Sequence, residues 1–166
     1  FFQAEDGIRA CLLSRGLGDV YKRQLFEPRF MSLTLRVLAT DQNVFDGSAD
    51  EVILPSTTGQ LGILPGHISL LTAIDIGVLR VRANGAWNSI ALMGGFAEVD
   101  ADEVTVLVNK AELGSSIDAA AAETAFQKAT TVVAGMEGQP ASPEKLKAQQ
   151  QLNEARARLQ ASKTAD

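Results

Sequence analysis

Residues 77–93 read GVLRVRANGAWNSIALM, two β-rich runs separated by Asn84 and Gly85. Both turn residues tolerate positive φ, so this spacing predicts a tight β-hairpin. In the first run, Arg80 and Arg82 fall where alternating side chains can face water, as expected for a strand with one buried face. Trp87 follows the turn, and we expect it to cover a sheet edge rather than to bind a ligand.

The same pattern extends on both sides of this hairpin. Every second residue from Leu33 to Val37 is apolar and is expected to face a core. Between residues 33 and 108, short β-rich runs alternate with turn residues: LTLRVLA, DEVILP, QLGILP, SLLTA, GVLRVRA, WNSIALM, GFAEVD and EVTVLV. This regular spacing predicts an all-β sandwich or barrel over residues 31–112.

A helical period replaces the β pattern in residues 113–166. Asp118 can cap a first helix over residues 119–134, and Ser142, Pro143 and Glu144 can start a second one after a break at residues 135–141. Two apolar stripes at helical spacing predict an α-helical hairpin: Ala122, Phe126, Ala129, Val133 and Ala148, Leu152, Ala155, Leu159. Because both stripes are thin and rich in alanine, we expect the hairpin to be only marginally stable when undocked.

Residues 1–30 have no sustained apolar period and lack the apolar core of a signal peptide. Residues 19–24 can be encoded by GAT GTG TAT AAG AGA CAG, which resembles the transposon end used in sequencing-library kits. Residues 3–9 likewise resemble a translated flow-cell adapter. We therefore expect residues 1–30 to be a non-native, disordered leader and Met31 to be the native start. A genomic read from independently prepared DNA that encodes the same leader would contradict this expectation.

The composition narrows the possible partners. The chain of 166 residues carries 15 Lys plus Arg against 20 Asp plus Glu, a net charge of -5, so nucleic acid is not an expected partner. The apolar runs fall far short of the roughly 20 residues that span a bilayer, so membrane association is expected only through another protein. The single cysteine, Cys11, excludes an intrachain disulfide and a multi-cysteine metal site.

The charge is distributed unevenly. Residues 31–112 contain ten acidic and four basic residues, whereas residues 142–166 contain three acidic and five basic ones. A basic second helix beside an acidic sandwich can dock on that sandwich or be attracted to another acidic surface. The alternative is an ordinary solvated helix face.

No pattern of catalytic residues is evident. His67 is the only histidine, and no Ser, Cys or acid stands at a spacing that identifies a triad, so we expect a structural hydrogen-bonding role for it. Gly59, Gly62 and Gly66 are not followed by Gly-Lys-Ser/Thr and are interpreted as turn glycines. The acids at residues 100–103 lie in a polar turn. The sequence therefore predicts no catalytic residue, no metal site and no cofactor.

Residues 59–67, GQLGILPGH, closely resemble the Gly-acid-Leu-Gly-Ile-Leu-Pro-Gly-His signature of the ATP synthase epsilon subunit family. The likeness covers residues 31–166 through LTLRVLATDQNVFDG, LLTAIDIGVLRV, MGGFAEV and VTVLVNKAEL, and the alanine-rich tail resembles the cyanobacterial and chloroplast branch. The resemblance implies an α+β protein in which an N-terminal all-β sandwich grips the gamma subunit and rests on the c-ring. It also implies a C-terminal helical hairpin that can extend to inhibit ATP hydrolysis.

Further consequences of the resemblance concern role and location. It implies a non-catalytic rotor subunit of the central stalk of a proton-translocating ATP synthase. Such a subunit lies on the cytoplasmic face of a thylakoid or plasma membrane through its complex. The turn expected to face the c-ring is Thr58, Gly59 and Gln60, with Gln60 where an acid is common. The family signature loop includes Gly62, Pro65, Gly66 and His67.

Some relatives bind ATP on the hairpin through an Ile/Leu-Asp-x-x-Arg-Ala motif and arginines of the second helix. Here the motif arginine is replaced by Ala121, although Asp118 is retained. On the second helix Arg158 is retained, whereas Glu154 replaces the other arginine. Because alanine offers no donor to a phosphate, ATP binding is not expected.

The resemblance also implies that an extended hairpin meets an acidic segment of the catalytic β subunit through Lys145, Lys147, Arg156 and Arg158. The runner-up interpretation is a β-sandwich ligand-binding module whose helical hairpin mediates dimerisation. Co-purification separates the two, because the first requires gamma and c-ring partners and the second a free dimer with a small ligand. An enzyme would need a convergent polar pocket that the sequence does not display.

Overall fold

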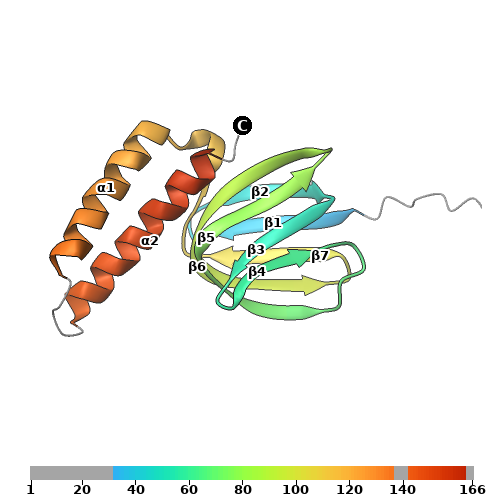
Figure 1. Cartoon of the computed structure of the whole chain (residues 1–166). Helices are drawn as coiled ribbons and strands as arrows, with labels where there is room; N and C mark the ends of the chain where they lie inside the picture. Colours follow the sequence, from blue (N-terminus) through green and yellow to red (C-terminus); the bar gives the residue numbers. More distant parts are fainter. Residues whose placement is uncertain (1–31, 137–141, 164–166) are drawn as a thin grey trace, which may run out of the picture. The chain divides into compact units, whose positions relative to one another are not determined.

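The computed structural model describes residues 32–136 and 142–163. The expected leader, residues 1–30, and the expected start at Met31 lie outside the described residues. The strands are β1 (Leu33–Ala39), β2 (Asn43–Ala49), β3 (Glu51–Ser56), β4 (Gly59–Ile63), β5 (Leu70–Ala83), β6 (Ala86–Asp100), β7 (Glu103–Val108) and β8 (Ala111–Leu113). A 3-10 turn, η2 (Gly114–Ser116), leads to the helices α1 (Ala119–Gly135) and α2 (Pro143–Lys163). The predicted fold class, a β-sandwich followed by a helical hairpin, is confirmed (Figure 1).

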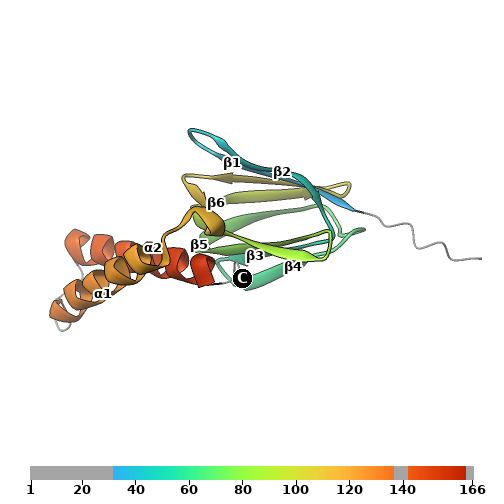
Figure 2. The ribbon, with the colours of Figure 1, turned by 90° about the horizontal axis from the view of Figure 1, so that it is seen from above.

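The sandwich is built around two long strands. The strand order is β2-β1-β7-β6-β5-β3-β4, with β8 paired to β6. Residues 70–74 of β5 pair with residues 95–99 of β6, next to β7, whereas the later part of β5 pairs with β3. Residues 90–92 of β6 pair with β8. The strands β5 and β6 therefore belong to both layers, and Figure 2 shows them running along the length of the sandwich.

The predicted hairpin at Asn84 and Gly85 is confirmed. These residues have φ values of 52° and 79°, and they join Ala83 to its partner Ala86. Arg82 is exposed as predicted, and its guanidinium carbon lies 6.0 Å from the ring centroid of Trp87. A cation over an indole face is favourable, so Arg82 and the partly exposed Trp87 stabilise each other beside the turn.

Four strand assignments differ from the prediction. The runs SLLTA and GVLRVRA form one strand, β5, and the runs WNSIALM and GFAEVD form one strand, β6. Strand β6 continues through the glycines at residues 94–95. A Cβ on Gly95 would collide with the carbonyl oxygen of Leu107 on the neighbouring strand, so this glycine permits a close approach between strands and does not end β6. The short strand β8 was not predicted, and neither was strand β2. Strand β2 carries Asp46 and Gly47, which are uncommon in strands but tolerated at a sheet edge.

The core lies between the two layers. The alternation predicted for β1 is confirmed, since the side chains of Leu33, Leu35 and Val37 are fully buried. Burying one such aliphatic side chain contributes about 1.5–3 kcal/mol. The other fully buried large side chains of this core come from five further strands: Val52, Leu54, Ile63, Leu79, Val81, Ile90, Leu92, Val99, Val104 and Val106.

The helices form the predicted hairpin, in which α2 packs against both α1 and the sheet (Figure 1). The predicted cap of α1 is confirmed, because the carboxylate of Asp118 accepts hydrogen bonds from the N–H groups of Ala120 and Ala121. The second helix has a contact surface that the stripe prediction missed. Ala157 and Ala161 are buried, and Ala161 packs with residues of β6.

Candidate functional site

The signature loop, residues 62–67, follows the start of β4 and is held by the turn between β6 and β7. The N–H of Gly66, whose φ is 82°, donates to Oδ1 of Asp102 at 2.5 Å. Asp102 itself has a φ of 65°, and its carbonyl accepts from the N–H of Thr34 at 2.9 Å. Positive φ is uncommon for a residue with a side chain and persists where surrounding contacts fix it. Asp102 therefore fixes the backbone of the signature loop.

His67 makes local hydrogen bonds at the end of this loop. Its ring Nδ1 lies 2.8 Å from the carbonyl oxygen of Ile68, and since a carbonyl can only accept, the ring nitrogen donates. Its backbone N–H donates to the carbonyl of Leu64 at 3.1 Å, which closes a turn around the half-buried Pro65. His67 therefore stabilises this turn through local hydrogen bonds. Within residues 32–136 and 142–163, no group of three or more His, Cys, Asp or Glu is placed to hold a metal ion.

The residues predicted to face the c-ring, Thr58, Gly59 and Gln60, are exposed; Thr58 lies in the turn between β3 and β4, and Gly59 and Gln60 begin β4. Gln60 also borders a hollow of about 320 Å³ that Arg80 and Lys163 line from the sheet and from the end of α2. The turn includes the first residues of β4 and the signature loop includes its last ones, so Gln60 and Gly62 lie two residues apart on one strand, about 7 Å at 3.3 Å per residue.

The positions of the nucleotide motif have other partners. The Oδ1 atom of Asp118 accepts from the N–H of Ala120 at 2.9 Å, so its carboxylate serves as a helix cap. Ala121 is exposed on the first turn of α1. Glu154 accepts a long hydrogen bond of 3.4 Å from Gln150, one turn earlier on α2. Glu154 therefore places an acid at the position where the resemblance implies an arginine.

Arg158 binds Glu112 of β8 in a forked ion pair. Its Nε atom donates to both carboxylate oxygens at 3.2 and 3.0 Å, and its Nη2 atom donates to Oε1 at 2.7 Å. The two side chains are 34% and 36% exposed. The interpretation of Arg158 as part of a solvated helix face is therefore wrong. In the structure the basic helix docks on the acidic sandwich through this residue.

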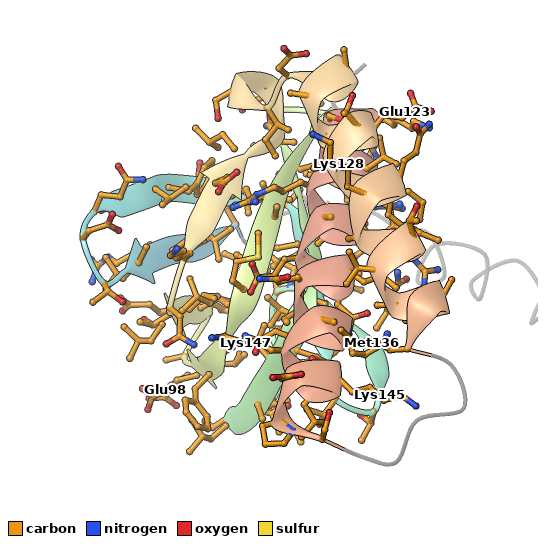
Figure 3. All side chains as sticks on the ribbon, turned by 90° about the vertical axis from the view of Figure 1, so that its left-hand side faces the viewer. Glu98, Glu123, Lys128, Met136, Lys145 and Lys147 are labelled. Carbon is orange, nitrogen blue, oxygen red and sulfur yellow. The ribbon has the colours of Figure 1, made fainter. Side chains whose placement is uncertain are left out.

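The other basic candidates lie elsewhere on α2. Lys145 and Lys147 occupy its first turns (Figure 3). Lys147 and Arg156 are exposed. Arg156 also lines a hollow of about 260 Å³ with Asp75 of β5. Of the four basic candidates, Arg158 is thus paired with the sandwich, Arg156 borders a hollow beside β5, and Lys145 and Lys147 lie in the first turns of α2.

Four apolar side chains form a row across the outer face of the sandwich, which we call the apolar row: Leu38, Leu107, Phe96 and Ala73. They are direct neighbours in register on β1, β7, β6 and β5. Phe96 is 61% and Leu107 54% exposed. Beside them lies a hollow of about 510 Å³, which Leu38, Phe96 and Leu107 line together with Asn109. Contiguous exposed apolar surface of this kind marks an interaction site.

The apolar row was missed by the sequence analysis. A signal was present, since alternation breaks down where Val37 is followed by Leu38 and where Leu107 lies between Val106 and Val108. A strand that is apolar on both faces is buried on both faces or binds a partner. The register that places the residues side by side could not be obtained from these runs.

Two family models match the chain. The ATP synthase delta/epsilon chain beta-sandwich domain matches residues 32–114, and the long alpha-helix domain of the same family matches residues 115–163. Neither helix in the described part of the chain is both long and apolar enough to cross a membrane.

Two curated relatives are similar along their whole length. The ATP synthase epsilon chain of Synechococcus sp. (strain CC9605) is 98% identical over 136 residues, which are 82% of this chain and 100% of the relative. The epsilon chain of Prochlorococcus marinus (strain MIT 9313) is 74% identical over 133 residues, which are 80% of this chain and 100% of the relative.

Solved structures with the same fold are more distant in sequence. A chain of the Euglena gracilis mitochondrial ATP synthase OSCP/F1/c-ring structure has a TM-score of 0.67 and 19% identity, over 80% of this chain and 81% of that chain. A chain of the Tetrahymena thermophila mitochondrial ATP synthase central stalk/c-ring structure has a TM-score of 0.54 and 13% identity, over 78% and 96%. The family models, which together match residues 32–163, and the curated relatives confirm the resemblance: the chain belongs to the ATP synthase delta/epsilon family, as an epsilon chain.

Proposed function

We propose that this chain works as a rotor subunit in the central stalk of a proton-translocating ATP synthase, without catalysis of its own. The relatives are named as epsilon chains of ATP synthases, and the chains of similar fold come from structures that contain the c-ring. The sandwich binds the gamma subunit and the c-ring, and the hairpin acts on the catalytic β subunit. Through these partners the chain lies on the cytoplasmic face of a thylakoid or plasma membrane.

The single observation that carries the proposal is the apolar row. An exposed phenylalanine, an exposed leucine and a half-buried leucine beside a hollow of about 510 Å³ are costly to leave in water, so a subunit that permanently covers them is favourable. We assign this face to the gamma subunit, which the family resemblance names as the subunit that the sandwich grips. The turn of Thr58, Gly59 and Gln60 is assigned to the c-ring.

Substitution of Phe96 by aspartate tests the assignment. A charge in the middle of an apolar contact must be desolvated without a partner, so the affinity for gamma is expected to fall by about tenfold or more. The measurement is the amount of gamma that co-purifies with the tagged chain. The control is Val132→Asp, an equally drastic change at an apolar residue of α1 that is 49% exposed.

Equal recovery of gamma with both variants would contradict the assignment of this face. Recovery of the unchanged chain as a free dimer with a small ligand, and without gamma or c-ring, would instead favour the ligand-binding module. Because Phe96 is exposed, its replacement should leave the thermal unfolding midpoint nearly unchanged, which separates lost binding from lost folding.

The hairpin is proposed to sense no nucleotide. The Asp118 carboxylate caps α1, Ala121 offers no donor, and Glu154 brings a negative charge where phosphate would lie. We expect calorimetric titration of the isolated chain with Mg-ATP to give no binding in the micromolar range. The double substitution Ala121→Arg and Glu154→Arg should improve binding if the motif geometry holds. Micromolar affinity of the unchanged chain would contradict this proposal.

The hairpin is proposed to regulate ATP hydrolysis. Its second helix carries Lys145, Lys147, Arg156 and Arg158, which suit an acidic surface on the catalytic β subunit. Exposed pairs contribute only about 0–1 kcal/mol each, so inhibition is expected to be distributed over several contacts and to weaken with salt.

A further inference from the structure

The interface between α2 and the sheet is made of small side chains. Ala91 and Met93 of β6 pack with Ala161 of α2, and Ile76 and Val78 flank them. An alanine buries little apolar area compared with a leucine, so this interface contributes much less than the core of the sandwich. Apolar burial alone therefore holds α2 weakly.

The interface is nevertheless tight and specific in shape. A Cβ on Gly114 of η2 would lie 2.5 Å from the carbonyl oxygen of Ala161 and 2.9 Å from that of Ser89. The backbones of α2 and of β6 therefore both lie directly against Gly114 of η2. Ser89 is buried, and in the described part of the chain its hydroxyl has no hydrogen-bond partner, so it adds no polar tie to this interface.

The forked ion pair of Arg158 and Glu112 supplies such a tie. It joins α2 to β8, next to this interface, through three hydrogen bonds of 2.7–3.2 Å. A guanidinium binding both oxygens of one carboxylate is the strongest common geometry for an ion pair, and it fixes direction as well as distance. Since both side chains are about one-third exposed, dissolved salt can weaken the pair.

We propose that the Glu112–Arg158 pair is a latch that sets how often the hairpin leaves the sandwich. Released from Glu112, the Arg158 guanidinium becomes available to an acidic surface on another subunit. Docking and inhibition then compete for the same guanidinium. This last consequence, though not the latch itself, rests on the proposed regulatory function.

The latch is tested on the full chain by following how often the α2–sheet interface opens. Met93→Cys places a thiol beneath α2 without adding volume, in a background in which Cys11→Ser removes the other thiol. The thiol reacts with an alkylating reagent only when α2 is undocked. The modification rate is therefore proportional to the undocked fraction.

Glu112→Gln and Arg158→Gln should each raise the modification rate by about three- to tenfold, the range expected for a partly exposed bidentate pair. The double variant should be no faster than either single variant, because both remove the same interaction. Added salt should accelerate the unchanged chain more than Glu112→Gln. The matched control is Arg156→Gln, two residues away on α2, which should leave the rate unchanged.

The latch is overturned if Glu112→Gln modifies no faster than Arg156→Gln, or if the two single effects multiply in the double variant. ATP hydrolysis by reconstituted complexes provides the second measurement. Glu112→Gln should lower hydrolysis because it frees Arg158, whereas Arg158→Gln should lower it less because the inhibitory contact is also lost. If Glu112→Gln raises the modification rate but leaves hydrolysis unchanged, the latch stands and the proposed inhibitory function is what fails.

Discussion

Deletion of residues 116–166 should raise ATP hydrolysis by the assembled complex about fivefold or more, within the usual range for regulatory coupling between sites. The deletion removes both helices and with them all four basic candidates of α2. It leaves the core between the strands intact, and it leaves the apolar row in place. Assembly with gamma and proton coupling should therefore be retained.

The measurement is the hydrolysis rate of reconstituted complexes at low and at moderate salt. A partial variant separates charge from bulk: Lys147→Glu with Arg156→Glu reverses two exposed charges but leaves the Glu112–Arg158 pair untouched. It should give part of the activation, most clearly at low salt. If truncated and full-length chains support equal hydrolysis at both salt concentrations, the hairpin is not an inhibitor in this complex.

Gly95→Ala should destabilise the sandwich by about 3 kcal/mol, which lowers the thermal midpoint by roughly 10 °C in a domain of this size. The added methyl group would collide with the carbonyl oxygen of Leu107 and lie 2.7 Å from Cα of Val108. Both atoms belong to the backbone of the paired strand β7, so a rotamer change cannot relieve the collision. The two strands must separate locally.

The matched control for this substitution is Gly62→Ala in β4. A Cβ at Gly62 meets nothing within 4 Å, so the same chemical change is made in a strand without a collision. Alanine in a strand is favoured over glycine by about 0.5–1 kcal/mol, and the control should be neutral or stabilising. Thermal unfolding of both variants decides the matter: equal midpoints would show that β6 and β7 are not this close.

Local patterns in the sequence were sufficient for much of the fold. The alternation of Leu33, Leu35 and Val37 identified β1 as a strand with one buried face, and Asn84 with Gly85 identified the hairpin turn between β5 and β6. Asp118 identified the start of α1. Each of these signals depends on residues fewer than five positions apart, where the backbone geometry itself fixes which side chains are neighbours.

Pairing between distant segments was beyond such patterns. The glycines at residues 94–95 were interpreted as a strand end, although β6 continues through them. Strand β2 was missed because its composition is that of a turn. A glycine that permits a close approach between strands and a glycine that permits a turn look the same in a sequence. Only the register of β6 against β7 distinguishes them.

The candidate sites divide in the same way. By itself, the sequence determined the family through GQLGILPGH, the fold class through its two periodicities, and the loss of the nucleotide motif through Ala121. Tertiary structure alone decided that Arg158 pairs with Glu112, 46 residues earlier, and that Leu38 lies beside Leu107. The function of a charged or apolar side chain depends on the residues that it contacts. Residues in contact across a fold are close in space, and no fixed spacing along the chain relates them.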